Sequence, residues 1–513
     1  MRARNQQRFD DDGIRRLPRE CWGLIINRMN SYHYLEDLSL VCKEFLSITN
    51  EARRTLRIFN RETIPLFPKL IQRFSKLKSI DLARIRGKEL NTLLHQIADS
   101  GLNLQELSMS PPLYDDDDDD YYYNDDEEKE KTCGFPDDLP NQLSDALRHL
   151  GSNMNCLKVF KCTGWFNFCD EYLLAIADSM PLLEELDIST NICSYGRSVT
   201  DDALETIGTT LKLRKLRRLD FSGHYNISFN CFRTYFTDLK LEKLSVVYSF
   251  LHMDSDLVWR GDIDFDFVLR NYRDLVSLKV GKISLPQCTI PVKSFALARS
   301  LQELEFCFVE VSFQLCSSIA EARLPLRKFV FSHCKIDSSN SFDALSSLFA
   351  AYPSLESLKL ENNTFPFCKG HLYLDDKRMS DLSQNLRNLR YLNISGLNCS
   401  TTSLTFYTLA RNCPLLQVLE MQMSFSRKQE GSSSSINNST IDHLHGSSVK
   451  NHDHIKFLNL SWSYSLDDQL LENLTVICPN LEFLHVTDCP GLTSGSSKRK
   501  ILKRWFKNME ITM

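Results

Sequence analysis

Four histidines lie close together in the C-terminal part of the sequence, where they could in principle bind a metal ion. They are His443, His445, His452 and His454, and the polar stretch SRKQEGSSSSINNST (426–440) precedes them. No cysteine accompanies them, and the surrounding composition is that of a linker. We therefore interpret this segment as a linker and expect no metal ligands.

The sequence also lacks the motifs that would indicate catalysis. It has no glycine-rich phosphate loop, no His-Glu-x-x-His pair, no Gly-x-Ser-x-Gly elbow and no convincing Cys/His pair. The 17 cysteines are scattered without Cys-x-x-Cys pairs, as expected of reduced thiols that fill space in a core. We expect no catalytic residue, no cofactor and no enzymatic activity in this chain.

Charge is concentrated in two segments rather than spread over the sequence. YDDDDDDYYYNDDEEKE (114–130) holds eleven carboxylates in seventeen residues, which predicts self-repulsion and disorder. It is either a tolerated surface insertion or a docking site for a basic partner. The basic SKRKILKRWFKN (497–508) is either a capping helix that buries its apolar side chains or a nuclear-import signal.

The overall composition excludes some partners. The formal net charge of -5, with 25% charged and 42% hydrophobic residues, argues against a dominant nucleic-acid or membrane-surface role. The first residues contain no apolar run typical of a signal peptide, and no uncharged stretch of about 18 residues could span a membrane. We expect a protein of the cytoplasm, the nucleus or both, with neither membrane nor nucleic acid as a partner.

A short apolar pattern recurs from residue 77 onward and must organise most of the chain. Its apolar residues occupy the first, fourth and sixth positions, and eight of the thirteen intervals between its fourteen copies are 25 to 29 residues long. The copies begin at Leu77, Leu104, Leu157, Leu183, Leu216, Leu241, Leu275, Leu301, Leu326, Leu355, Leu389, Leu416, Ile455 and Leu481. This spacing predicts a strand whose fourth and sixth residues face a core while the residues between them face outward.

Helical segments separate the predicted strands, for example DEYLLAIADSMP (170–181) and FDALSSLFAAYP (342–353). Pro181, Pro353, Pro414 and Pro479 each stand two residues before a repeat leucine, where a proline ends the helix. Each repeat is therefore predicted to be strand, loop and helix. Such units bury their apolar edges only against their neighbours, which predicts an α/β solenoid.

The segments CPLLQVLEM (413–421) and CPNLEFLHVTDCPGL (478–492) resemble the cysteine-containing class of leucine-rich repeats. Asn191, Cys334, Asn363 and Cys489 stand eight residues after their repeat leucines, where members of that class place an Asn or Cys that bonds to the turning backbone. Other copies lack it. The resemblance implies a leucine-rich-repeat solenoid, or horseshoe.

The N-terminal segment LPRECWGLIINRMNSYHYLEDLSLVCKEFLSITN (17–50) has helical rather than strand spacing. Trp22, Ile25, Ile26 and Met29 form one apolar stripe, and a second follows at Leu38, Val41, Cys42, Phe45 and Ile48. Pro18 suits the first turn of a helix. About 40 residues bury too little surface to be stable alone, so we expect a partner to cover part of this segment.

This segment resembles the F-box, a small all-α domain. The matching features are Leu17-Pro18, Glu20, the paired Leu35 and Leu38, and Leu-Val-Cys-Lys at 40–43 followed by an aromatic residue at 45. The resemblance implies binding to a Skp-type adaptor and, through it, to a cullin. The positions that it implies as adaptor contacts are Leu17, Pro18, Ile25, Leu38, Val41, Cys42 and Phe45.

Together these patterns predict a disordered N-terminus (1–16), an F-box (17–60), about 14 leucine-rich repeats (61–497) with insertions at 113–136 and 425–454, and a basic cap or tail (498–513). The implied function is recruitment of an unknown protein substrate to an SCF-type ubiquitin ligase, as in plant members of the family. Outward strand positions, including Asp187, Asp220, Glu305 and Glu420, are the expected substrate contacts. Two alternatives remain: a repeat scaffold without a ligase role, and an F-box receptor gated by a small molecule.

Overall fold

The computed structural model describes residues 17–28, 32–58, 60–83, 87–110, 140–165, 168–190, 198–224, 226–247, 265–281, 295–309, 311–334, 339–361, 373–399, 403–422, 453–463, 468–489 and 510–512, with single residues 85, 466 and 492. Two compact units are present. The first comprises 1–163 and 171–183, and the second comprises 164–170 and 184–513. The acidic insertion, the stretch 425–452 and the predicted C-terminal helix lie outside the described residues.

The first unit begins with three helices, α1 (Arg19–Arg28), α2 (Tyr32–Val41) and α3 (Lys43–Ala52). We call α1–α3 and the preceding Leu17 and Pro18 the helical module. Strands β1 (Thr55–Arg57), β2 (Ser79–Ala83), β3 (Glu106–Ser110) and β4 (Val159–Cys162) follow, with β1 paired to β2, β2 to β3 and β3 to β4, all in parallel. The connections contain a 3-10 helix (Arg61–Leu66), α4 (Phe67–Arg73), α5 (Gly87–Asp99) and α6 (Pro140–Asn153), while α7 (Asp170–Ser179) follows β4.

The second unit repeats strand, loop and helix from β5 onward. Its strands form a parallel sheet in the order β5 (Glu185–Asp187), β6 (Arg218–Asp220), β7 (Lys243–Val247), β8 (Ser277–Gly281), β9 (Glu303–Cys307), β10 (Lys328–Ser332), β11 (Ser357–Glu361), β13 (Tyr391–Asn393), β15 (Val418–Glu420), β16 (Phe457–Asn459), β17 (Phe483–His485) and β18 (Glu510–Thr512). A separate pair of short strands joins β12 (Tyr373–Leu374) to β14 (Asn398–Cys399).

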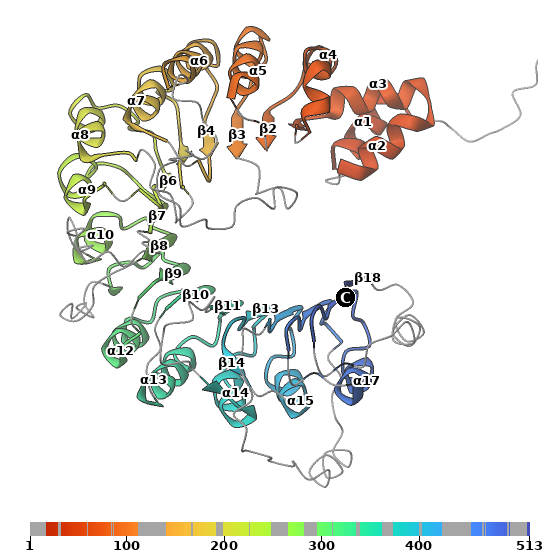
Figure 1. The fold of residues 1–513 in the computed structure, drawn as a ribbon, viewed down its shortest axis with the longest axis vertical. Coiled ribbons are helices and arrows are strands. Elements are labelled where there is room, and N and C mark those ends of the chain that lie inside the picture. The colour runs from red at the N-terminus through yellow and green to blue at the C-terminus, as the bar shows by residue number, and fades with distance from the viewer. Residues whose placement is uncertain are drawn as a thin grey trace, which may run out of the picture. The chain divides into compact units, whose positions relative to one another are not determined.

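Among the described residues of this unit, helices cover one side of the sheet and none covers its other side (Figure 1). They are α8 (Asp201–Thr209), α9 (Phe229–Tyr235), α10 (Phe265–Asn271), α12 (Phe313–Ala322), α13 (Ser339–Ala350), α14 (Asp376–Ser383), α15 (Ser403–Asn412) and α17 (Asp468–Ile477). The core lies between the strands and these helices.

The burial of the repeat residues explains this layering. The fourth and sixth residues of the repeats are buried, as in Leu358 and Leu360, while the residues beside them are half-exposed. The first residue of each repeat, such as Leu355, is also buried. The predicted leucine-rich-repeat solenoid is confirmed.

A tight turn follows many of the strands at the eighth residue of the repeat. This residue has a positive φ in several repeats, including Gly223, Gly396, Phe308, His333 and Trp462. Its amide donates to a carbonyl of the next repeat, as Gly223 N–H does to Val247 O at 2.8 Å. A Cβ at Gly223 would lie only 2.6 Å from the carbonyl oxygen of Thr190, so glycine is required there for space as well as for conformation.

A buried histidine joins the first two turns of the second unit. His224 is fully buried, and its Nε2 lies 2.8 Å from the carbonyl oxygen of Ile188, which can only accept. Nδ1 therefore carries no proton and accepts from the Val199 amide at 3.2 Å. Burial lowers the pKa of His224 to about 4, against a smaller raising effect of the Ile188 hydrogen bond and of Asp220 and Asp170.

Candidate protein-docking surfaces

The helical module has a small internal core that holds its three helices together. Ile26, Ile48 and Ala52 are buried there, with Trp22 packed edge-on against Phe45 at a ring distance of 4.9 Å. Leu35 and Leu38 complete this core from α2. Since these side chains point inward, the opposite sides of α1 and α2 must meet solvent or a partner.

Polar contacts fix the relative positions of α1 and α3. The Arg19 guanidinium donates to Ser47 Oγ at 2.8 Å and forms an ion pair with Glu51. Cys42 stands before α3 as its N-cap, and its sulfur accepts from the Phe45 amide at 3.4 Å. The segment between α2 and α3 is therefore held in a defined conformation.

The adaptor-contact positions implied by the F-box resemblance fall into two groups. Leu17, Pro18, Ile25, Val41 and Cys42 are exposed on the module surface. Leu38 and Phe45 are only half-exposed, because they also pack against the internal core. A substitution at either of the latter two would affect the folding of the module as well as any interface.

Three further apolar residues on this surface were not predicted from the sequence. Leu24 is 68% exposed, Leu40 is 84% exposed and Tyr34 is 55% exposed. Leu24 lies two residues from both Trp22 and Ile26, so a helical wheel with those two residues inward would have put it on the outer side. The amphipathic pattern predicts the buried stripe and does not by itself mark the apolar residues opposite it as exposed.

Exposed apolar side chains are concentrated in the module. Among the described residues, fourteen large hydrophobic side chains are exposed, and six of these lie between positions 17 and 41. They are Leu17, Leu24, Ile25, Tyr34, Leu40 and Val41. A concentration of exposed apolar side chains in one small module is typical of a site that a protein partner covers.

The module also packs against the first repeat. The Arg73 guanidinium donates to Asn50 Oδ1 at 2.9 Å, and the Arg53 guanidinium lies 4.9 Å from the centre of the Phe74 ring. Lys76 forms a long ion pair with Glu51 at 3.9 Å. The module thus covers the end of the repeat array with α3 while α1 and α2 carry the exposed apolar side chains.

The helix-free side of the second unit's sheet is the other candidate surface, and its side chains form two rows. The first row consists of Glu185, Arg218, Lys243, Ser277, Glu303, Lys328, Ser357, Tyr391, Val418, Phe457 and Phe483. The second row, two residues later, consists of Asp187, Asp220, Ser245, Lys279, Glu305, Val330, Lys359, Asn393, Glu420, Asn459 and His485. The four predicted substrate contacts all belong to the second row.

Two of these four carboxylates stabilise the local backbone. Asp187 Oδ1 accepts from the Ser189 amide at 3.1 Å, and Asp220 Oδ1 accepts from the Ser222 amide at 3.0 Å. Such Asx turns define how the chain leaves the strand. Burial and the neighbouring Asp220 carboxylate raise the pKa of Asp187. These two side chains therefore have a structural role that the sequence pattern did not suggest.

The other two carboxylates differ in how their charge is balanced. Glu305 lies 2.9 Å from the Lys279 ammonium. Burial has the largest single effect on the pKa of Lys279 and lowers it, but Glu305, Cys307 and Asp220 together raise it overall. Glu420 instead accepts from the Tyr391 hydroxyl at 3.1 Å and from Asn393 Nδ2 at 2.9 Å, both neutral donors. Among the described residues Glu420 has no cationic partner.

The ninth residue of the repeat, eight residues after the repeat leucine, also behaves as its class resemblance implies. The thiol of Cys334 is 3.3 Å from the carbonyl oxygen of Phe306, and that of Cys489 is 3.2 Å from the carbonyl oxygen of Leu460. Each sulfur thus binds the turning backbone of the preceding repeat. Asn191 and Asn363 lie outside the described residues.

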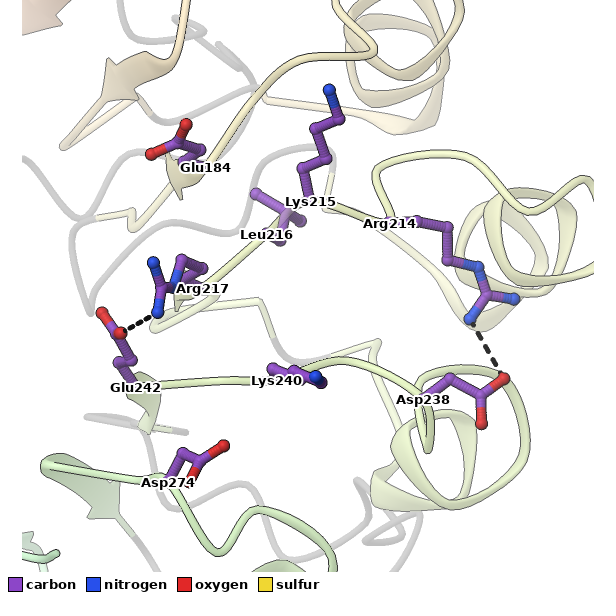
Figure 2. Close-up of a pocket in the computed structure, with 9 residues that line it drawn as sticks. All are labelled: Glu184, Arg214, Lys215, Leu216, Arg217, Asp238, Lys240, Glu242 and Asp274. Atoms are coloured by element: carbon purple, nitrogen blue, oxygen red, sulfur yellow. Dashed lines mark ion pairs between the residues drawn. The ribbon is translucent and has the colours of Figure 1, made fainter.

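A charged pocket of about 660 Å³ lies where the chain enters β6 and β7 (Figure 2). Its ion pairs join Arg217 to Glu242 at 2.6 Å and Arg214 to Asp238 at 3.6 Å. Among the described residues that line it, Leu216 is the one apolar residue. Small-molecule sites are mostly apolar, so this pocket does not favour the ligand-gated alternative.

Metal binding and membrane insertion find no support in the described part of the chain. No cluster of three or more His, Cys, Asp or Glu side chains there has the proximity that a metal ion needs. Of the four C-terminal histidines, only His454 is described, and it is exposed. Among the described helices, none combines the length and apolarity that a membrane span requires.

Comparison with known proteins adds little to this picture. No family model matches the chain. Solved structures similar to it include the Rad7 and Elc1 complex of yeast, with 13% identity, a TM-score of 0.43 and coverage of 96% of this chain and 92% of the other. Another is the TLR13–ssRNA13 complex, with 13% identity, a TM-score of 0.32 and coverage of 88% and 60%. Likenesses this distant carry no argument about function, and the parallel sheet and buried repeat positions of the chain itself define it as a leucine-rich-repeat solenoid.

Proposed function

We propose that this chain is the substrate-recruiting subunit of an SCF-type ubiquitin ligase. The helical module would bind a Skp-type adaptor, and the helix-free side of the sheet would bind the protein to be ubiquitinated. The observation that carries the proposal is the cluster of exposed apolar side chains on α1 and α2, in the segment that resembles an F-box.

The energetics of this surface favour a permanent or frequent partner. Fully burying one Leu, Ile or Val side chain contributes roughly 1.5 to 3 kcal/mol relative to leaving it in water. Leu24, Leu40 and Val41 are each more than half exposed, so their apolar area is still available to an interface. The helices that carry them are already ordered by the internal core, which reduces the entropic cost of binding.

In this proposal the chain acts by proximity rather than by chemistry. It holds a target close to a conjugating enzyme that is bound through the adaptor and the cullin, and so raises the effective concentration of the target's lysines. Other subunits form the isopeptide bond, which agrees with the expectation that this chain is not an enzyme. The complex would act in the cytoplasm, the nucleus or both.

A specific observation supports a second candidate, a repeat scaffold without a ligase role. The contacts of Arg73 with Asn50 and of Arg53 with Phe74 are those of a cap on the repeat array. A cap needs an apolar side toward the array and a polar side toward solvent. The exposed Leu24, Leu40 and Val41 do not meet the second requirement, so we favour the adaptor-binding role.

The experiment is co-purification of the full chain with a Skp-type adaptor, using the wild type and a Leu17→Ala/Pro18→Ala variant. Loss of two interface anchors should cost about 2 kcal/mol or more, roughly a thirtyfold weakening of binding. Both residues are exposed, so the variant should keep its thermal stability. A wild-type chain that does not bind the adaptor would leave the scaffold as the remaining interpretation.

A further inference from the structure

The two rows of the second unit's sheet change character between β11 and β13. From β5 to β11 the first row is polar or charged at every strand. From β13 to β17 it becomes Tyr391, Val418, Phe457 and Phe483, which lie side by side on neighbouring strands. We call these four side chains the apolar stripe.

The apolar stripe remains accessible on the helix-free side of the sheet. Tyr391, Val418 and Phe457 are half-exposed, and Phe483 is 39% exposed. The rings of Phe457 and Phe483 are 6.4 Å apart, and the His485 ring lies 5.2 Å from that of Phe457. An aromatic surface of this kind on a sheet face marks an interaction site rather than a solvated surface.

The second row, beside the apolar stripe, contains a carboxylate that favours a positively charged group on a partner. Glu420 lies next to Val418 and is flanked by the uncharged Asn393 and Asn459 of the neighbouring strands. The Tyr391 hydroxyl and the Asn393 amide both orient this carboxylate, yet its negative charge is not neutralised by any described residue. A cation from a partner would form a charge-assisted hydrogen bond with it at little cost in reorganisation.

The dimensions of the stripe suit a short extended segment. Four neighbouring strands at a spacing of about 4.8 Å span about 14 Å, which an extended chain covers in four to five residues. Side chains that alternate along such a segment would place apolar groups on the stripe and a basic group at Glu420.

We propose that the apolar stripe and Glu420 form the recognition site for a target segment that carries apolar residues beside a lysine or arginine. This inference rests on the proposed function, because it names the chemistry of the protein that the solenoid recruits. It also assigns recognition to one end of the sheet, away from Asp187, Asp220 and Glu305.

The first test uses a displayed library of random peptides selected on the immobilised full-length chain. We expect enrichment of peptides that have at least two apolar residues near a lysine or arginine. Selection on a Phe457→Ala/Phe483→Ala variant should lose this motif, whereas a Glu303→Gln variant, which changes a first-row carboxylate outside the stripe, should keep it.

The second test measures the affinity of one enriched peptide by fluorescence anisotropy. The Phe457→Ala/Phe483→Ala variant should bind at least thirtyfold more weakly than the wild type. Glu420→Gln should weaken binding about tenfold, and this loss should disappear for a peptide whose basic residue is replaced by glutamine. Thermal unfolding of each variant should stay close to that of the wild type, since none of the substituted side chains is buried.

Several results would overturn the proposal: absence of enrichment, enrichment of acidic peptides, or peptide binding that neither variant changes. A wild-type dimer that becomes a monomer in the Phe457→Ala/Phe483→Ala variant would show that a second copy of the chain occupies the stripe. Adaptor binding by the helical module, measured on the same preparations, reports separately on the proposed function. Retained adaptor binding without peptide recognition would therefore contradict this inference alone.

Discussion

Lowering the pH from about 7.5 to 5 should favour local unfolding of the first turns of the second unit, because His224 stays neutral in the folded state over this range. Its folded pKa is about 4, below an ordinary value of 6.5. The contribution of neutral His224 to the free energy of unfolding is therefore fully present above about pH 6.5. It is lost as the pH falls toward 4, because the histidine of the unfolded state is protonated over this range while the folded-state histidine stays neutral. A difference of 2.5 pKa units at about 1.36 kcal/mol per unit corresponds to about 3 kcal/mol in total.

A variant separates this effect from the titration of carboxylates. His224→Gln retains a donor for the Ile188 carbonyl but does not titrate, and all other groups are common to both proteins. Between about pH 7.5 and pH 5.0, the wild type should lose about 2 kcal/mol more of its local opening free energy than the variant. Hydrogen exchange of residues 198–224 measures this opening free energy directly.

The result that would refute this reasoning is a wild-type-to-variant difference that stays constant within about 0.5 kcal/mol over the same pH range. It would mean that His224 keeps an ordinary pKa and that the segment 198–199 does not enclose it.

Two further predictions concern the turns and the thiols. Gly223→Ala should destabilise the protein by at least about 2 kcal/mol in urea unfolding, because the new Cβ meets the Thr190 carbonyl. Gly101→Ala is the control: Gly101 also has a positive φ but has open space around it, so this substitution should destabilise the protein by about 1 kcal/mol. Equal costs at the two glycines would contradict the close approach. Iodoacetamide at about pH 8 should modify the exposed Cys42 within minutes and leave Cys413 unmodified in the folded protein, since burial raises the pKa of Cys413 to about 12. Bound adaptor should protect Cys42 from modification. Mass spectrometry of the labelled peptides measures the modification of both cysteines. If the adaptor leaves the labelling of Cys42 unchanged, Cys42 does not lie in the interface.

The repeat architecture was predictable because one short pattern determines it. Leucines such as Leu355 and Leu358 are buried whatever the rest of the repeat contains, so fourteen weak signals at regular intervals add up to one fold. The bond from Cys334 to the turning backbone could be anticipated for the same reason, since its position in the repeat determines its surroundings.

The surfaces were less predictable, because exposure depends on which side of each element packs inward. The outward orientation of Leu24 and Leu40 follows once Trp22, Ile26 and Leu38 are known to pack inward, but helical spacing alone does not determine which apolar stripe packs inward. Asp187 and Glu420 look equivalent in the sequence, yet Asp187 forms an Asx turn, whereas Glu420 accepts from neutral donors and has no cationic partner among the described residues. The apolar stripe appears only when the register of β13 to β17 brings residues that lie far apart in sequence side by side.

The central claim, that the helical module binds a Skp-type adaptor through its exposed apolar surface, is tested most directly by calorimetric titration of the adaptor into the full chain. The wild type should bind, and Val41→Asp should abolish detectable binding, since it places a charge in an apolar interface. Leu211→Asp is a matched control, because Leu211 is 65% exposed and Val41 is 62% exposed, but Leu211 lies in the second unit. Equal binding by the wild type, Val41→Asp and Leu211→Asp, or no binding by any of them, would contradict the account.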